Sequence, residues 1–354
     1  MRGVSLARTR SPMSTNAKPK SGRPVQTHHT EDGLRIEEVS IAGHVGPVTL
    51  RLYRPAGSAA GAAHEAAGEP GVVVPLEAHL PAVLYFHGGG FCNGSLDDGD
   101  VAARYLASHV PALVVSVGYS LAPEHPFPAA PEDAWCAARW LQRHARRYGA
   151  SPRRLAVVGH DAGGNIAAAL TMISRDRGEV AIAAQVLLAP LLDPSMTRLA
   201  DGRTPSDIEA SECARCYRAY LPHATQRLHP YAAPLESRRL AGLPPTLIAS
   251  AEHDLLHVEA EKYAAELIAA GVPTQVTRHR SASHHGLAAL PAALREVAAF
   301  LTRRLAPPRH RLYPVSPSDP GDLKNDHPRS QTCTHCRRRY GGASGHRHAH
   351  RRAR

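Results

Sequence analysis

Apolar and polar positions alternate with two different periods between residues 34 and 305. Short apolar or alternating runs, which predict β-strands, are separated by stretches with helical spacing. The expected strands are Leu34–Val39, Val48–Tyr53, Ala82–Phe86, Ala112–Val117, Leu155–Val158, Ile182–Leu188, Thr246–Ala251 and one that includes Val276. The expected helices are Ala134–Ala145, Gly163–Ser174, Val258–Ala270 and Leu287–Leu305. This alternation predicts an α/β fold around a mostly parallel sheet, with an antiparallel edge where the first strands have no helix between them.

The alternation stops between Asp193 and Leu243, which predicts an insertion that covers the carboxyl edge of the sheet as a cap. We expect one α/β domain over residues 31–305, with its cap insertion at about 193–243. A basic leader (1–30) and a basic, His/Arg-rich tail (306–354) are both expected to be disordered, because neither has a periodic apolar pattern.

The net charge of +11 resides in the two tails. Residues 1–30 carry +6 and residues 303–354 carry +10, which leaves −5 for the rest. A mildly acidic domain with solvated basic tails does not call for a nucleic-acid partner. No apolar run approaches the roughly 18 residues that span a bilayer, and the N-terminus lacks the apolar core of a secretory signal. We expect a cytoplasmic protein without a membrane span.

Two pairs of cysteines have CxxC spacing. Cys333 and Cys336 precede a histidine-rich stretch, so a zinc site is an alternative there, but the segment has no apolar pattern to support one. Cys213 and Cys216 lie in a predicted helix, where this spacing puts both on one face, and we expect them to be buried. We therefore expect neither a metal nor a cofactor.

Three segments carry candidate chemistry. The first, His87-Gly88-Gly89-Gly90-Phe91, directly follows an apolar strand. Glycines let the backbone turn sharply and direct N–H groups outward, where they can stabilise an oxyanion. The alternative is a plain glycine-rich turn, but a strand followed by this sequence is typical of an oxyanion-hole loop.

The second segment is Val158-Gly-His-Asp-Ala-Gly-Gly-Asn165, between a predicted strand and a predicted helix. This is the setting of a nucleophile elbow, in which Gly159, Gly163 and Gly164 leave room for a sharp bend around position 161. A phosphate-binding turn is the alternative, but the GxGxxG spacing is absent. The third segment pairs Asp254, after a strand, with His285, in the order nucleophile, acid, histidine of α/β-hydrolases.

Together these motifs resemble the hormone-sensitive-lipase group of carboxylesterases. The matching segments are HGGGF at 87–91, YSLAPEHPFP at 119–128, GHDAGGN at 159–165, GLPP at 242–245, AEHD at 251–254 and HG at 285–286. The resemblance implies an α/β-hydrolase fold, with an eight-stranded sheet, helices on both faces and a helical cap. It implies an oxyanion hole from the N–H groups of Gly89, Gly90 and Ala162, and an Asp254 that orients His285. His284 is the neighbouring alternative, but the group's histidine precedes a glycine.

The chain departs from that group at the nucleophile. The usual elbow reads GDSAGG, and this one reads GHDAGG, so Asp161 fills the serine position and His160 replaces an aspartate. The group also has cap helices before the first strand, where this chain has the leader.

An aspartate is ionised near neutral pH and can attack without a base. The GHD triplet resembles the elbow of epoxide hydrolases and haloalkane dehalogenases, which use such an aspartate. We expect a hydrolase of small to medium apolar, ester-like substrates, with Asp161 as nucleophile or as general base for water. The alternatives are an epoxide or haloalkane hydrolase and a catalytically inactive ligand-binding protein, as the plant gibberellin receptor is within this family. A small molecule is the expected partner, and a homodimer is left open.

Overall fold

The computed structural model describes residues 27–29, 33–56, 79–200 and 204–307. The predicted leader therefore lies outside the described residues except for 27–29, and the predicted tail except for 306–307. The Cys333–Cys336 pair also lies outside them.

Nine strands form one sheet in the order β1-β2-β3-β5-β4-β6-β7-β8-β9. Neighbours from β1 to β5 are antiparallel and those from β5 to β9 are parallel, which confirms the predicted antiparallel edge. Eight of the strands, β2 to β9, correspond to those expected, and the three-residue β1 adds a ninth. Their bounds are β1 Thr27–His29, β2 Leu34–Ala42, β3 Pro47–Pro55, β4 Leu80–Phe86, β5 Leu113–Gly118, β6 Ala150–His160, β7 Ala184–Leu188, β8 Thr246–His253 and β9 Thr274–Ser283.

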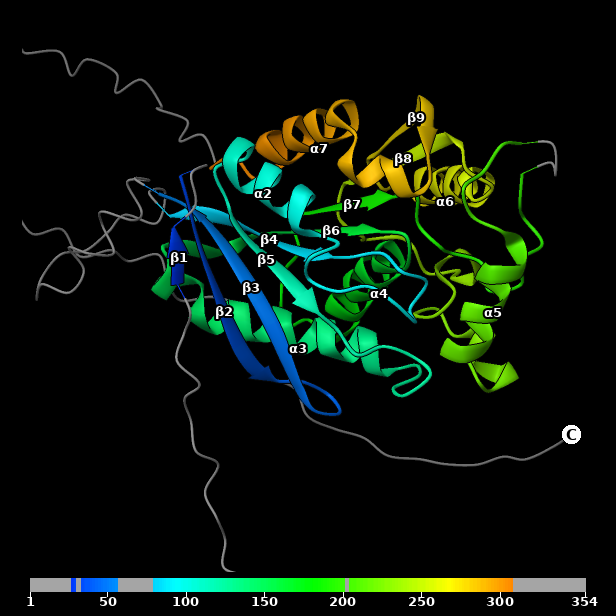
Figure 1. Cartoon of the computed structure of the whole chain (residues 1–354), viewed down its shortest axis with the longest axis horizontal. Coiled ribbons are helices and arrows are strands. Elements are labelled where there is room, and N and C mark those ends of the chain that lie inside the picture. The colour runs from blue at the N-terminus through cyan, green and yellow to red at the C-terminus, as the bar shows by residue number, and fades with distance from the viewer. Residues whose placement is uncertain (1–26, 30–32, 57–78, 201–203, 308–354) are drawn as a thin grey trace, which may run out of the picture. The chain divides into compact units, whose positions relative to one another are not determined.

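Helices cover both faces of this sheet (Figure 1). Alternate side chains of a strand point to opposite faces, and a strand covered on both sides is therefore apolar throughout. In β4, Val83 and Tyr85 pack into the core with α2 and α7, whereas Leu84 and Phe86 pack into the core with α3, α4 and α6. The helices are α2 Asp100–His109, α3 Ala129–His144, α4 Ala162–Arg177, α5 Ala210–Tyr220, α6 His257–Ala269 and α7 Pro291–Arg304.

Two helical predictions needed correction. The pattern did not predict α2, whose sequence is short and rich in alanine. The last helix, expected over Leu287–Leu305, is divided into a 3₁₀ helix, η5, at His285–Ala289 and α7, which begins at Pro291. Proline at the first helical position has no N–H to offer the preceding turn and so favours a new start there.

The segment predicted as a cap consists of α5 and the short 3₁₀ helices η3 (Ala224–Leu228) and η4 (Pro234–Glu236). Cys213 and Cys216 lie on α5 and are both buried, as expected from their spacing. Phe91, from the loop after β4, stacks on Tyr220 of α5 with ring centroids 3.9 Å apart. This aromatic contact packs the segment against the predicted oxyanion loop.

Within the described ranges, no helix combines the length and the apolarity needed to cross a bilayer. In the same part of the chain, no three His, Cys, Asp or Glu side chains are grouped so that they could hold a metal ion.

Candidate active site

The three chemistry-bearing segments meet at the carboxyl edge of the parallel strands. The glycine loop follows β4, Asp161 follows β6, Asp254 follows β8, and His284 follows β9 (Figure 1). Ligands of open α/β sheets bind at this edge, because the loops that leave the strands converge there.

Asp161 occupies a strained backbone position between β6 and α4. Its φ is 54° and its ψ −119°, a left-handed region that residues other than glycine rarely adopt. The bend is possible because Gly163 has no side chain, since a Cβ there would collide with the carbonyl oxygen of Phe86 in β4. The elbow thus holds the Asp161 side chain beside the loop that follows β4.

The Asp161 carboxylate accepts hydrogen bonds from that loop. Its Oδ2 lies 2.8 Å from the backbone nitrogen of Gly89 and 2.8 Å from that of Gly90. Gly89 has a φ of 121°, which only glycine adopts readily, and this conformation aims its N–H at Asp161. Two of the three groups predicted to form the oxyanion hole therefore bind the protein's own carboxylate. The third, Ala162, is the first residue of α4.

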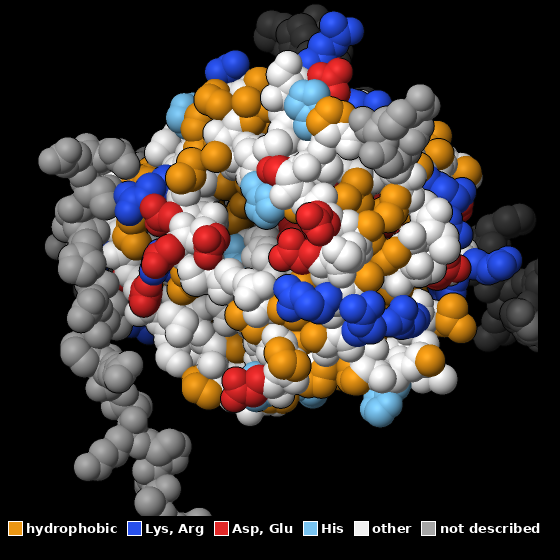
Figure 2. All heavy atoms as spheres, turned by 45° about the vertical axis from the view of Figure 1, so that its right-hand side comes forward, with side chains coloured by type: hydrophobic (Ala, Val, Ile, Leu, Met, Phe, Trp, Pro, Cys, Tyr) orange, Lys and Arg blue, Asp and Glu red, His pale blue; other side chains and the backbone are white. Residues whose placement is uncertain are grey.

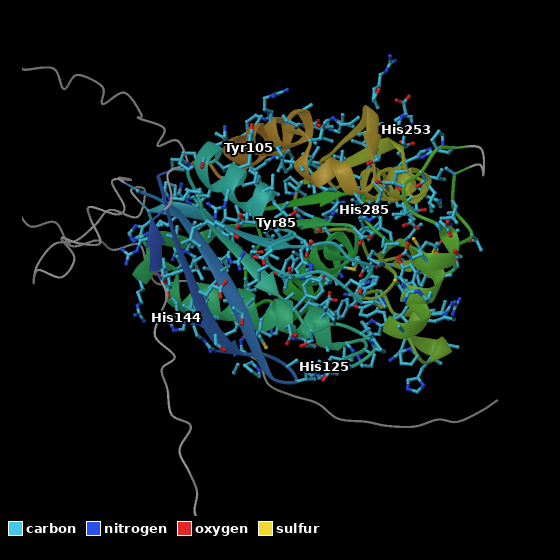
Figure 3. The ribbon with its side chains drawn as sticks, viewed as in Figure 1. Tyr85, Tyr105, His125, His144, His253 and His285 are labelled. Carbon is cyan, nitrogen blue, oxygen red and sulfur yellow. The ribbon has the colours of Figure 1, made fainter. Side chains whose placement is uncertain are left out.

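His284, and not His285, lies between the two carboxylates. Its Nδ1 is 3.0 Å from Oδ2 of Asp254, and its Nε2 is 3.4 Å from Oδ1 of Asp161. The prediction that Asp254 orients His285 is therefore wrong. The side chain of His285 is 68% exposed and contacts Asp207 at 3.2 Å (labelled in Figure 3). Strand β9 ends at Ser283 and η5 begins at His285, so the two neighbouring side chains leave the turn in different directions.

The backbone of His284 is held on both sides. Asp207 accepts hydrogen bonds from the N–H groups of His284 (2.9 Å) and His285 (3.1 Å). The Nε2 of His160 lies 3.0 Å from the His284 carbonyl oxygen, to which it donates. The sequence singled out His160 only as part of the elbow, and it gave no signal for Asp207, which lies in the irregular insertion.

Opposite charges stabilise each other within this buried group. Burial opposes the charged form of His284, but hydrogen bonds to Asp161 and Asp254 raise its pKa to about 10. Burial likewise opposes the ionised form of Asp161, but His284, His160 and the Gly90 N–H hold its pKa well below the ordinary value. At neutral pH the site therefore contains an imidazolium between two carboxylates.

The remaining motif residues support this arrangement. His87 is buried, stacks on Tyr119 with centroids 4.3 Å apart, and accepts the Tyr119 hydroxyl at its carbonyl oxygen. Gly88 leaves room for the His160 ring, since a Cβ there would lie 2.7 Å from its Nδ1. Gly159 and Gly164 take part in the tight packing of the elbow, each lacking space for a side chain.

Asp161 and His284 both line a cavity of about 170 Å³. The insertion contributes four of the residues around it, which the sequence could not identify. The lining consists of Gly89, Gly90, Asn93, Asp161, Leu191, Ile208, Glu212, Cys213, Cys216, His284 and His285. Figure 2 shows this face hollowed, with acidic side chains on both sides of the hollow.

Known proteins that are similar to this chain include α/β-hydrolases and esterases. A family model described as an α/β-hydrolase fold matches residues 83–288. Esterase LipI of Mycobacterium tuberculosis is 40% identical over 266 residues, which cover 74% of this chain and 77% of LipI. Carboxylesterase NlhH of the same organism is 38% identical over 58% of this chain, and the match spans 66% of NlhH.

A solved structure, a hyperthermophilic esterase from Pyrobaculum calidifontis, aligns with a TM-score of 0.65 and 34% identity. The alignment covers 77% of this chain and 84% of that esterase. The residues that the family model matches extend from β4 to η5 and include the segments that supply the site. The chain therefore belongs to the α/β-hydrolase family and, within it, to the carboxylesterase group, as a hydrolase of the carboxylic-ester-hydrolase type.

Proposed function

We propose that this chain hydrolyses small apolar, ester-like substrates through a covalent ester on Asp161. Asp161 is the nucleophile, His284 moves protons, and Asp254 orients His284. The observation that carries this proposal is the orientation of the Asp161 carboxylate. Gly89 and Gly90 bind Oδ2, while Oδ1 faces His284 at the cavity.

In the first step, Oδ1 of Asp161 attacks an electrophilic carbon of the substrate. A bond forms between Oδ1 and that carbon, and the bond from the carbon to its leaving group breaks. Where the leaving group is basic, such as an alkoxide, the imidazolium of His284 supplies its proton. The carbonyl oxygen of the resulting aspartyl ester is Oδ2, which already accepts the N–H groups of Gly89 and Gly90.

In the second step, water cleaves that ester. The charge of Asp161 is one cause of the raised His284 pKa, and ester formation removes this charge. Where the leaving group is a halide or a carboxylate and takes no proton, the imidazolium then releases its proton to solvent. Neutral His284 can then accept a proton from water, whose oxygen attacks Cγ of Asp161. The negative charge that develops on Oδ2 is stabilised by the Gly89 and Gly90 N–H groups, which is the role of an oxyanion hole. Collapse releases the alcohol and restores the ionised aspartate and the imidazolium.

Attack on an ordinary ester carbonyl fits this geometry less well. That reaction would form an anhydride on Asp161, and the departing alkoxide is the poorer leaving group, so the intermediate would revert. A substrate carbonyl oxygen would also compete with Oδ2 for the same two N–H donors. General-base catalysis by Asp161 meets the same competition. The favoured substrates react at saturated carbon: a strained lactone as the ester-like case, or an epoxide or alkyl halide.

The cavity supports a small substrate. Its volume of about 170 Å³ is below the range of about 300–1,000 Å³ of sites for drug-sized ligands. Leu191 and Ile208 contribute apolar surface, while Asp161, His284 and Glu212 contribute charged groups. Such a site favours a compact apolar molecule with one reactive carbon.

A ligand-binding protein without turnover is the second candidate. It is favoured by the way in which Asp161, His284 and Asp254 already neutralise one another and occupy the Gly89 and Gly90 donors. In that case the cavity binds a ligand, and the charged groups have a structural role.

A single turnover in heavy-oxygen water separates these candidates. The enzyme, in excess, is mixed with one of four probes: β-butyrolactone, styrene oxide, bromobutane or nitrophenyl acetate. The mass of the peptide that contains Asp161 is then measured. We expect heavy oxygen in Asp161, because water attacks Cγ of the aspartyl ester. The variant Asp161→Asn is the matched control and should neither turn over nor acquire label.

Turnover without label in Asp161 would contradict the nucleophile role and support general-base catalysis. No turnover of any probe, with a folded protein, would support the binding candidate instead.

A further inference from the structure

Two thiols from different elements meet beside the cavity, and one of them lines it. Cys92 lies in the turn after Phe91, and Cys216 lies on α5 and lines the cavity. Both are free thiols. The Sγ of Cys92 is 3.8 Å from the carbonyl oxygen of Cys216 and donates to it. Cys216 is 3% exposed, and Cys92 is partly exposed. A small solute can therefore reach the pair at Cys92.

The contact joins α5 to the glycine loop, whose Gly89 and Gly90 N–H groups bind the Asp161 carboxylate. A Cβ built on Gly90 would lie 2.9 Å from Sγ of Cys216, so this sulfur packs directly against the loop backbone. The N–H of Cys92 donates to the carbonyl oxygen of Gly89 at 3.1 Å, which places Cys92 in the same turn. A covalent bond between the two sulfurs would therefore link the glycine loop to the cap segment.

The four cysteines that the structure describes differ in the pKa of their thiols, and therefore in reactivity. The side-chain interaction with Cys216 lowers the pKa of Cys92 to about 7; burial opposes this change, and the positive charge of Arg215 adds to it. The same interaction raises the pKa of Cys216. Burial raises the pKa of Cys213 to about 12 and also raises that of Cys136. Since the thiolate is the reactive form, Cys92 is the favoured nucleophile of the four.

We propose that Cys92 and Cys216 form a redox-modification site, at which a peroxide converts the two thiols into a disulfide. The Cys92 thiolate attacks one peroxide oxygen, the O–O bond breaks, hydroxide leaves, and Cys92 becomes a sulfenic acid. The Cys216 sulfur then attacks the Cys92 sulfur, and its proton leaves with the displaced hydroxide as water. The two thiols lose two electrons, and hydrogen peroxide is reduced to two molecules of water.

This site is separate from the proposed chemistry at Asp161. The disulfide would fix α5 against the loop that carries Gly89 and Gly90, and so covalently join two walls of the cavity. Its formation is read from peptide masses and not from turnover, so the result does not depend on whether Asp161 is a nucleophile.

The test treats the full chain with hydrogen peroxide near neutral pH and maps the disulfides. Cys333 and Cys336 are replaced by serine in the background, so that the tail thiols do not react. Trypsin cleaves after Arg215 and after Arg218, which separates Cys213 from Cys216 and leaves Cys216 in a three-residue peptide. We expect this peptide to be linked to the peptide that contains Cys92 and to be released by dithiothreitol.

The rate gives a second readout. Alkylation of Cys92 before oxidation should be at least about tenfold faster than that of Cys136, because more of Cys92 is thiolate at neutral pH. The variant Cys136→Ser is the matched control and should keep the cross-link. In Cys216→Ser, Cys92 should stop at the sulfenic acid and be trapped by dimedone.

Several results would overturn the proposal. They are a Cys213–Cys216 link in place of the expected one, oxidation of Cys92 to the sulfinic acid with Cys216 still reduced, and unreactive Cys92 in the folded chain. If Cys216→Ser does not fold, the peptide map of the unsubstituted pair decides the matter alone.

Discussion

Two histidines that are neighbours in sequence form very different ion pairs at the same edge of the sheet. His284 is 2% exposed and lies between Asp254, which is fully buried, and Asp161. His285 is largely exposed and contacts Asp207, which is itself partly exposed. Both pairs consist of an imidazole and a carboxylate at about 3 Å, and they differ mainly in their access to water.

The difference shows that access to solvent determines how strongly the two charges of an ion pair interact. Charges that are buried together interact strongly and are costly to separate, while an exposed pair is screened and contributes little. The pKa of His284 is accordingly raised to about 10 by Asp161 and Asp254, in opposition to burial. The site therefore depends on one ring that two carboxylates keep charged.

Replacement of the buried ring should have the largest effect. His284→Asn leaves two carboxylates facing each other without a cation, and we expect the free energy of unfolding to fall by about 3–5 kcal/mol. His285→Asn, the matched neighbour, should change it by less than about 0.5 kcal/mol. Urea unfolding near neutral pH measures both. Equal losses in the two variants would remove the contrast between the pairs.

Alkaline pH should reproduce part of that loss. The raised pKa means that between 6.5 and about 10 the folded state binds more protons than the unfolded state. The stabilisation from His284 is thus complete below 6.5 and is lost as the pH rises through about 10. The loss should be smaller than in His284→Asn, because the neutral ring can still hydrogen-bond to Asp254.

Unfolding measured across this pH range should show the slope in His285→Asn and lack it in His284→Asn. The same slope in both variants would assign the titration to another group.

Replacement of Asp161 by serine tests the occupied oxyanion donors. Asp161→Ser removes the carboxylate from Gly89 and Gly90 and lowers the pKa of His284, so that the ring can serve as a base. We expect hydrolysis of nitrophenyl acetate to rise by about a hundredfold, the usual effect of an oxyanion donor. Asp161→Ala is the control, since it frees the donors without providing a nucleophile. A folded serine variant no faster than the alanine variant would count against a complete esterase site around position 161.

Loss of the hydrogen bond behind His284 should have the smallest effect. His160→Phe leaves the His284 carbonyl oxygen without its donor and should cost about 1–2 kcal/mol in unfolding free energy. His160→Gln, which can still donate a hydrogen bond, should keep most of the free energy of unfolding and most of the rise in the His284 pKa. If both variants behaved alike, the hydrogen bond would not position His284.

The sequence predicted the parts of the molecule that depend on periodic burial and glycine geometry. The strands near Ala82, Leu155 and Thr246 follow from apolar runs, and the bend at Asp161 follows from Gly159, Gly163 and Gly164. The resemblance implied that Asp161 lies near the glycine loop, since it places Gly89 and Gly90 in the oxyanion hole. The structure adds the reason, because the two segments leave the carboxyl ends of adjacent strands.

Other features depend on where side chains point within irregular turns. The pattern could not distinguish His284 from His285, because the backbone geometry between β9 and η5 decides which of the two side chains faces Asp254. Asp207 lies in the insertion and binds through backbone N–H groups, which leave no mark in a sequence. That Oδ2 of Asp161 occupies the Gly89 and Gly90 donors follows from the extra length of aspartate over serine, which the motif alone does not reveal.

The charge of His284 in the resting protein underlies both the proposed catalysis and the contrast with His285. It is measured most directly by nitrogen NMR of the histidine side chains at about pH 8, with His284→Asn used to assign the signal. We predict that both ring nitrogens of His284 carry protons at this pH, because its pKa is raised to about 10. A neutral His284 at that pH would show that Asp161 and Asp254 do not hold the ring as an imidazolium.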